Sequence, residues 1–249
     1  MTQRVLALRG AQNFRDLGGY PTPSGETAWG QVFRSARLTN LSEDDVALLL
    51  ARGLRTVVDL RTIAEVGRAG PGLLAGKVER LHHSLLTPSL VLRPALDYTD
   101  WTQAAVRPLT AIFARMTGPV DPFPLVFHCS VGKDRTGILA ALLLSALGCP
   151  REVIVADYAL TRQHFNPSGD QVGKWRRRVL RHFPGVPAER SRQLLDADPD
   201  TMATFLDTLA SRNGSIAAFL EKVGVRAPQQ AILRARLLRA TRPATEQSP

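Results

Sequence analysis

The sequence predicts an α/β domain built around a central, mostly parallel sheet that is flanked by helices, with a helical C-terminal third. Segments of strand and helix pattern alternate along residues 31–147, an order that is typical of a parallel sheet covered on both faces. From residue 150 onward every periodic segment is of helical type. The 249 residues, 44% of them hydrophobic, suffice for one sizeable core. We therefore expect a single domain over residues 1–242 and a flexible tail over residues 243–249.

The N-terminal part is expected to begin with a turn-rich, hairpin-like segment over residues 13–35, which includes a strand at 31–33. Ser42, followed by three acidic residues, has the pattern of a helix N-cap, and Gly53 the pattern of a helix end. We therefore expect a helix between these two residues. The next expected strands are a clear one at residues 54–60 and a weaker one at residues 78–82.

Three segments in the middle of the chain frame its most unusual stretch. A helix is expected at residues 98–116, a short buried strand at 125–127, and a helix at 136–147 that is apolar nearly all round and closed by Gly148. Such a helix is expected to lie buried against the sheet. Functional groups then belong at the C-terminal ends of the strands.

The C-terminal third is expected to be a set of helices without an internal repeat or a low-complexity linker. It is also basic: residues 162–192 contain eight Lys and Arg against two acidic residues. The expected helices span residues 151–165, 172–183, 187–196, 199–212, 216–223 and 228–240.

The chain is strongly basic, with a formal net charge of +10 and a pI near 10.7. A surface of this charge attracts anions, which include nucleic acid, acidic lipid and phosphorylated substrates. Composition alone does not choose among these three classes of partner.

Compartment and redox state are inferred from what the chain lacks. Its apolar runs are shorter than the roughly 20 residues that cross a bilayer. The apolar stretch near its N-terminus is too short for the hydrophobic region of a secretory signal. We expect a cytoplasmic protein, although leaderless secretion leaves no mark in a sequence. Cys129 and Cys149 flank one expected helix, too far apart for a disulfide, so both are expected to be free thiols.

The stretch HCSVGKDRTG, residues 128–137, places one of only two cysteines between a buried strand and a buried helix. Backbone N–H groups of residues 130–135 can surround a tetrahedral oxyanion there, and the helix dipole adds positive potential. The guanidinium of Arg135 can bind two of its oxygens. The expected oxyanion-binding residues are His128, Ser130, Val131, Gly132, Lys133, Arg135 and Thr136.

Cys129 is the expected nucleophile of this loop. A cysteine at a helix N-terminus beside Lys and Arg has a lowered pKa and exists as thiolate at neutral pH. Attack on phosphorus produces a cysteinyl phosphate that water hydrolyses, and the hydroxyl of Thr136 can ease departure of the sulfur. His128 is expected to orient the loop rather than to shuttle protons.

The leaving group of such a reaction needs a proton, which a nearby carboxylic acid supplies. Asp134 lies within the loop, but Lys133 and Arg135 flank it and favour its ionised form unless a bound phosphate opposes them. Reasoning from the residues alone leaves three other candidates open: Asp59, Asp97 and Asp100.

The loop resembles the signature of the cysteine-dependent protein tyrosine phosphatases. Its GKDRTG portion is similar to the bacterial branch whose members also act on phosphoserine, phosphothreonine and phosphoinositides. Three further segments support the resemblance, which spans nearly the whole chain. They are NFRDLGG at residues 13–19, DLR at residues 59–61, and the pattern from Gly214-Ser215-Ile216 through Phe219-Leu220 to Gly224.

The resemblance implies a phosphatase with Cys129 and Arg135 in catalytic roles and favours Asp134 over Asp97 and Asp100 as the acid. It implies phosphorylated protein or phosphoinositide substrates, no cofactor and no metal. Phe219 departs from the family, where tyrosine is common, at a packing position. The basic helices within residues 172–212 fall where relatives carry a lid. A lid of this charge suggests peripheral contact with an anionic membrane, while the oligomeric state stays open.

Other function classes fit less well. A nucleotide-binding loop needs Gly at Phe127 and Ser or Thr at Asp134, and a thiol oxidoreductase needs a second cysteine near Cys129. A phosphate- or nucleic-acid-binding protein without turnover remains the alternative, although such a module usually lacks the cysteine or Arg135. We do not expect nucleic acid as a partner.

Two alternative roles are expected for each of three further arginines. Arg15, Arg34 and Arg61 are expected either to line the mouth of the pocket or to be surface or capping residues.

Overall fold

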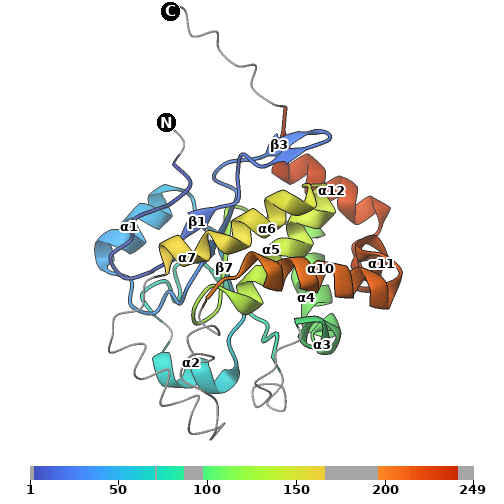
Figure 1. Ribbon diagram of the computed structural model, residues 1–249. Coiled ribbons are helices and arrows are strands. Elements are labelled where there is room, and N and C mark those ends of the chain that lie inside the picture. Colours follow the sequence, from blue (N-terminus) through green and yellow to red (C-terminus); the bar gives the residue numbers. More distant parts are fainter. Residues whose placement is uncertain (1–2, 71, 87–97, 166–195, 241–249) are drawn as a thin grey trace, which may run out of the picture.

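In the computed structural model, which describes residues 3–70, 72–86, 98–165 and 196–240, helices enclose a five-stranded sheet (Figure 1). The strand order is β1-β4-β7-β5-β6. The edge strand β1 pairs antiparallel with β4, whereas all other neighbours are parallel. The predicted mostly parallel sheet is confirmed. The strands are β1 (Arg15–Asp16), β4 (Val32–Ser35), β5 (Thr56–Asp59), β6 (Glu79–His82) and β7 (Leu125–His128).

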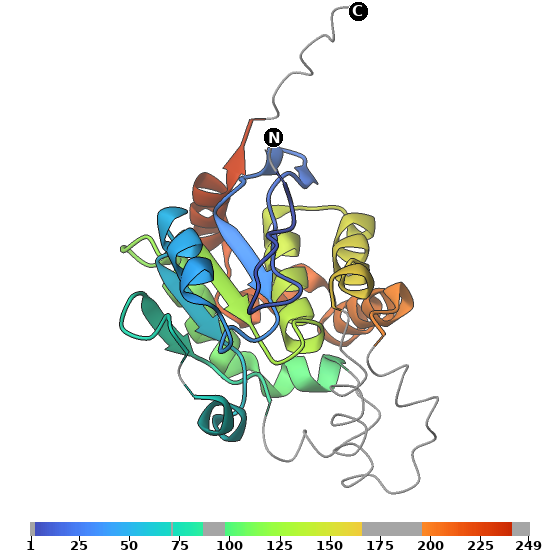
Figure 2. The same cartoon turned by 90° about the vertical axis from the view of Figure 1, so that its left-hand side faces the viewer.

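The three central strands are buried on both faces, and their residues alternate between two hydrophobic clusters. Val57 and Val126 pack with α1 (Glu43–Ala51), whereas Val58 and Phe127 pack with α5 (Asp134–Leu147). Figure 2 shows the helices on the two sides of the sheet. The sheet therefore forms the middle layer, as the run of apolar residues in each strand predicts.

Helix α5 is the centre of the larger cluster. Twelve of its fourteen residues are buried, in agreement with the expectation of a helix that is apolar all round. A single helix is buried to this extent only when other helices cover the sides that the sheet leaves open. Those helices are α3 (Tyr98–Ala104), α6 (Arg151–Ala159), α11 (Ile216–Lys222) and α12 (Ala227–Leu237).

A second, three-stranded sheet joins the two ends of the described chain. The hairpin of β2 (Pro21–Thr22) and β3 (Gly25–Thr27), predicted from the turn residues, pairs through β3 with β8 (Leu238–Arg239). The helix expected at residues 228–240 therefore ends at Leu237. Backbone pairing with Glu26 and Thr27 replaces the last helical turn.

Two predicted helices are each divided in the structure. The segment 98–116 forms α3 and then α4 (Val106–Thr117), with a break at Ala105. Pro108 lies in the first turn of α4, where its missing N–H is tolerated. The segment 151–165 forms α6 and the short α7 (Thr161–His164).

Helix α2 (Ile63–Ala69) was not predicted. The expected helix at 199–212 is α10 (Pro199–Asn213). The helix expected at 172–183, nearly all of that at 187–196, and the tail at 243–249 lie outside the described residues, as does most of the proposed lid.

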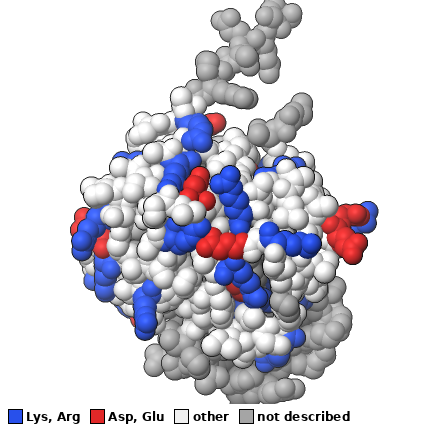
Figure 3. Space-filling view, turned by 180° about the vertical axis from the view of Figure 1, so that it is seen from behind, with Lys and Arg blue, Asp and Glu red and all other residues white. Residues whose placement is uncertain are grey.

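Two surface properties concern the expected partners. No helix in the described part of the chain is long and apolar enough to cross a membrane. Figure 3 shows the face opposite to that of Figure 1, where Lys and Arg side chains lie among acidic and uncharged ones. Most of the basic segment 162–192 lies outside the described residues.

Candidate active site

The loop that contains Cys129 leaves the C-terminal end of β7, the middle strand of the sheet. Helix α5 begins at Asp134, two residues before the predicted start, because the N–H of Gly137 already donates to the carbonyl of Lys133 at 2.7 Å. Asp134 and Arg135 thus belong to the first helical turn. The loop lies at the sheet edge where ligands of parallel sheets are expected.

Cys129 is almost fully buried, with 2% of its surface exposed. The backbone N–H of Gly132 donates to its Sγ at 3.2 Å. Gly132 has a φ of +74°, and a Cβ there would lie 2.6 Å from the backbone of Ser35 and Ala36. Only glycine therefore allows this loop conformation. The buried hydroxyl of Thr136 has no hydrogen-bond partner within the described residues, so a bond to Cys129 stays a prediction.

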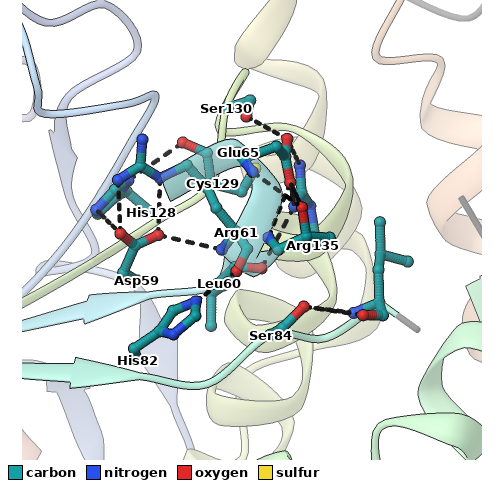
Figure 4. Close-up of polar contacts among 12 residues, drawn as sticks. Asp59, Leu60, Arg61, Glu65, His82, Ser84, His128, Cys129, Ser130 and Arg135 are labelled. Carbon is teal, nitrogen blue, oxygen red and sulfur yellow. Dashed lines mark hydrogen bonds and ion pairs between the residues drawn. The ribbon is translucent and has the colours of Figure 1, made fainter. Parts of the chain in front are cut away.

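Arg135 is held by a carboxylate that the sequence analysis did not identify. Its Nη1 donates to Oε2 of Glu65 at 2.7 Å and its Nη2 to Oε1 at 3.0 Å, and the hydroxyl of Ser130 donates to Oε1 at 2.6 Å. Figure 4 shows Glu65 and Arg135 beside the loop. Glu65 therefore orients the guanidinium and links it to the Ser130 side of the loop.

The geometry leaves Arg135 with donors for an anion. Nη1 also donates to the carbonyl of Leu60 at 3.4 Å, so Glu65 and Leu60 occupy both of its hydrogens. Nε–H and the second Nη2–H make no hydrogen bond within the described residues. These two donors lie parallel on one edge of the planar guanidinium, the arrangement that binds two oxygens of a phosphate.

The contact between Glu65 and Arg135 stabilises the ionised form of both side chains. Burial alone works against both, but hydrogen bonds and charge from Arg135 hold the pKa of Glu65 well below its usual range. Burial lowers the pKa of Arg135, but the negative charges of Cys129 and Glu65 outweigh that effect and raise it above its usual value. Arg135 is therefore a cation and Glu65 an anion at any ordinary pH.

Glu65 comes from the N-terminus of α2, where it is the third helical residue. Its Oε2 accepts from the backbone N–H of Thr62 at 2.9 Å, and the hydroxyl of Thr62 accepts from the N–H of Glu65 at 3.3 Å. This reciprocal capping box has the sequence signature Thr-x-x-Glu. The signature lies directly after the predicted strand 54–60, so it could have revealed both α2 and Glu65.

The outer face of the loop is held by Asn13 and Arg34. The Asn13 amide donates to the carbonyl of Val131 at 3.3 Å and of Gly132 at 3.0 Å, and Nη2 of Arg34 donates to the latter at 2.8 Å. Because C=O and N–H of one peptide unit point in opposite directions, holding these carbonyls outward directs the next N–H groups inward. The N–H of Gly132, which reaches Sγ, is one of them.

Asp157 of α6 is the buried centre of this support. It forms ion pairs with Arg15, at 3.1 Å, and with Arg34, and accepts from the hydroxyl of Tyr20 at 2.9 Å. Burial opposes the carboxylate, yet the two arginines hold its pKa well below the usual range. Arg15 and Arg34 are fully buried, so neither lies at the surface or at the mouth of a pocket. They brace the loop from behind.

We predict that Asp157→Asn lowers the free energy of unfolding by about 3–5 kcal/mol, because it leaves two buried guanidinium groups with one charged partner fewer. Urea unfolding of wild type and variant measures the difference. Asp207→Asn is the matched control, because Asp207 pairs with Arg151 on the exposed surface and surface pairs contribute little. Equal effects of the two variants would contradict the role of Asp157.

A second ion-pair group lies at the end of β5 (Figure 4). Asp59 is fully buried and pairs with Arg61 at 2.6 Å and Arg80 at 2.7 Å. Burial opposes its charge, but these arginines, together with His128, hold the pKa of Asp59 well below the usual range. It is therefore ionised, which disfavours it as the proton donor. Arg61 is buried too, so it is not a surface residue, and it lines a small pocket together with Asp59, Arg80 and His128.

His128 is buried beside this group. Its Nδ1 lies 3.2 Å from the carbonyl oxygen of Cys129, and its Nε2 lies 3.8 Å from Oδ2 of Asp59. Burial lowers the pKa of His128 to about 4, against the opposing effect of Asp59. A neutral ring that contacts the cysteine backbone supports the loop-orienting role predicted for it.

Asp134 lies at the start of α5 with its side chain about one quarter exposed. The Nζ of Lys133 lies 3.1 Å from Oδ1, and the hydroxyl of Tyr98 donates to the same oxygen. Lys133 also donates to the carbonyl of Asp196 at 3.2 Å. Of the alternative acids, Asp100 pairs with Arg212 at 2.6 Å on the surface, and Asp97 lies outside the described residues.

Comparison with known proteins decides the family. The model of the tyrosine phosphatase family matches residues 6–239, nearly the whole chain. The chain belongs to the tyrosine phosphatase family. The family resemblance seen in the HCSVGKDRTG loop is thereby confirmed, and the enzyme class with it.

Two relatives of this phosphatase have names that describe their activity. The triple specificity protein phosphatase PtpB of Mycobacterium tuberculosis is 29% identical over 89% of this chain and 94% of its own length. A tyrosine-protein phosphatase of Nostoc commune is 32% identical over 53% of this chain and 48% of its own length. Among solved structures, TpbA of P. aeruginosa matches with 18% identity over 72% of this chain and 95% of that chain, with a TM-score of 0.37.

The predicted loop residues lie together between the C-terminal end of β7 and the first turn of α5. Lys133 contacts Asp134 and Asp196, and Ser130 contacts Glu65. Within the described ranges no cluster of three or more His, Cys, Asp or Glu side chains is placed to hold a metal ion. Glu65, Asp157 and Tyr98 were not among the residues predicted from the sequence.

Proposed function

We propose that this phosphatase hydrolyses phosphomonoesters through a cysteinyl-phosphate intermediate. Its substrates would be phosphotyrosine and, in addition, phosphoserine, phosphothreonine and phosphoinositides. The observation that carries the proposal is the pairing of Cys129, whose sulfur accepts a backbone N–H, with Arg135, which Glu65 holds with two parallel donors unused. A sulfur nucleophile and an oriented guanidinium within one loop suit attack on a phosphoryl group.

In the first step the Cys129 thiolate attacks phosphorus. A bond between sulfur and phosphorus forms while the bond from phosphorus to the leaving oxygen breaks. The leaving oxygen takes the proton of Asp134, which becomes a carboxylate. Arg135 and the N–H groups of the loop bind the equatorial oxygens, where charge develops.

In the second step water attacks the cysteinyl phosphate. The carboxylate of Asp134 accepts one proton of that water, the bond between sulfur and phosphorus breaks, and the thiolate and inorganic phosphate are released. Cys129 and Asp134 thus return to their starting states. The residues of the chain supply nucleophile, acid and electrostatic stabilisation, so the proposal involves no metal or cofactor.

The wide substrate range rests on the GKDRTG loop and on the name of the Mycobacterium relative, a triple specificity phosphatase. We infer a reducing, cytoplasmic location from the two free thiols. Peripheral contact with an anionic membrane is proposed on the basis of the net charge of +10. Neither of these two inferences enters the chemical mechanism.

We predict that the wild-type enzyme releases phosphate from a phosphotyrosine peptide, from phosphoserine and phosphothreonine peptides, and from phosphoinositide vesicles. Malachite green detection of phosphate measures all four, and EDTA should leave the rates unchanged. For the vesicles, activity should fall as salt is added, because salt screens attraction to an anionic surface. Absence of turnover on every substrate would overturn the proposal in favour of a binding protein.

A further inference from the structure

The two oxygens of the Asp134 carboxyl group have different surroundings. Oδ1 accepts from the hydroxyl of Tyr98 and lies 3.1 Å from Nζ of Lys133. Oδ2 has no hydrogen-bond partner among the described residues. Oδ1 can accept from both donors whether the carboxyl group is charged or neutral, because a protonated acid keeps a carbonyl oxygen. The proton of the neutral acid therefore resides on Oδ2.

The hydroxyl of Tyr98 has a defined direction. It lies 2.8 Å from the hydroxyl of Tyr158. An ionised Asp134 only accepts, so the Tyr98 hydroxyl donates to it and in turn accepts from Tyr158. Burial, reinforced by the charge of Asp134, raises the pKa of both phenols well above the ordinary value. Both hydroxyls therefore keep their protons, and the chain runs from Tyr158 through Tyr98 to Asp134.

The two rings are fixed by packing. Tyr98 is almost fully buried and stacks on Trp101 at a centroid distance of 5.7 Å, with Phe205 edge-on at 6.0 Å. The ring of Tyr158 lies against Gly137, where a Cβ would come within 2.9 Å of it. The glycine that follows Thr136 in the loop motif thus makes room for Tyr158. A donor on a rigid ring holds its acceptor in one place.

We propose that Tyr98 is a positioning residue for the general acid: it binds Oδ1 of Asp134 and so leaves Oδ2 to carry the proton to the leaving oxygen. This inference rests on the proposed function, in which Asp134 is the acid. The role concerns only the proton-transfer step. Loss of the Tyr98 hydroxyl should therefore matter in proportion to how much the leaving group needs a proton.

The test compares kcat/KM for phenyl phosphate, whose leaving group needs a proton, with that for p-nitrophenyl phosphate, whose phenolate departs readily without one. This parameter reports the steps up to leaving-group departure and is blind to later hydrolysis of the intermediate. Tyr98→Phe should lose on the order of tenfold on phenyl phosphate, a typical effect of one hydrogen bond to a charged group, and less than about threefold on p-nitrophenyl phosphate. Its inhibition constant for inorganic phosphate should be unchanged.

Two further variants separate positioning from structure. Asp134→Asn should show the same selectivity with a larger loss, and adding Tyr98→Phe to it should cause no further selective loss. Tyr20→Phe is the matched control, because that buried hydroxyl also binds a carboxylate, that of Asp157, but not Asp134. It should leave the ratio of the two kcat/KM values at the wild-type level.

The outcomes are distinguishable. A Tyr98→Phe loss that is equal on both substrates, or one that persists in the Asp134→Asn background, would show a structural role and overturn the inference. An Asp134→Asn loss without selectivity would overturn it as well, because Asp134 would then not be the acid. If the wild type hydrolyses neither substrate, the proposed function itself fails.

Discussion

Cys129→Ser is expected to abolish turnover of p-nitrophenyl phosphate, with a fall in kcat on the order of 10⁴-fold or more, comparable to removal of a nucleophile in other enzymes. The serine hydroxyl stays protonated at neutral pH and is a weak nucleophile without an adjacent base. Binding of oxyanions should survive. The N–H groups of the loop, Arg135 and the orienting Glu65 are all unchanged by the substitution.

Steady-state kinetics measures the loss, and calorimetric titration with inorganic phosphate measures the binding that remains. Cys149→Ser is the matched control, because burial raises the pKa of the Cys149 thiol to about 12, so it contributes no thiolate. That variant should keep near wild-type activity. If Cys129→Ser also kept it, the covalent mechanism would be wrong.

Arg135→Lys is expected to lower kcat/KM for the same substrate by about 10²–10³-fold, the usual range for loss of a donor that stabilises developing charge. Arginine here serves two partners at once: it binds Glu65 with Nη1 and Nη2 and presents Nε–H and Nη2–H toward an anion. An ammonium group is a compact charge without a planar fork. It cannot bind Glu65 and two phosphate oxygens in the same geometry.

The measurement pairs kcat/KM with the inhibition constant for phosphate, which should weaken in parallel. Arg151→Lys, at an exposed ion pair on α6, should leave both values unchanged. Activity of Arg135→Lys close to that of the wild type would show that the fork plays no part in catalysis.

Much of the site was predictable because its chemistry is local. Cys129 and Arg135 lie six positions apart on one loop, and the strand and helix around them are marked by an apolar run and by Gly148. The parallel sheet followed from the alternation of elements. These features depend on neighbours in the chain, so a sequence pattern records them directly.

Helix boundaries were less predictable where the end of a helix pairs with a segment that is distant in the sequence. The pattern of residues 228–240 is helical, yet its end forms β8 because β3 offers a backbone to pair with. Helix α2 was missed, although its Thr-x-x-Glu capping box stands in the sequence. A short helix carries too few apolar positions to show a period, so only the capping residues indicate it.

By itself the sequence determined the class of fold and the family, and it predicted the nucleophile and the anion-binding loop. Only the tertiary structure decided which side chains serve them: Glu65 orients Arg135 across 70 positions, Tyr98 holds Asp134 across 36, and Asp157 braces Arg34 across 123. A buried arginine and an exposed one look alike in a sequence, which is why the burial of Arg15, Arg34 and Arg61 could not be predicted. Their partners are set by the order of strands in the sheet, and that order arises only when the core packs.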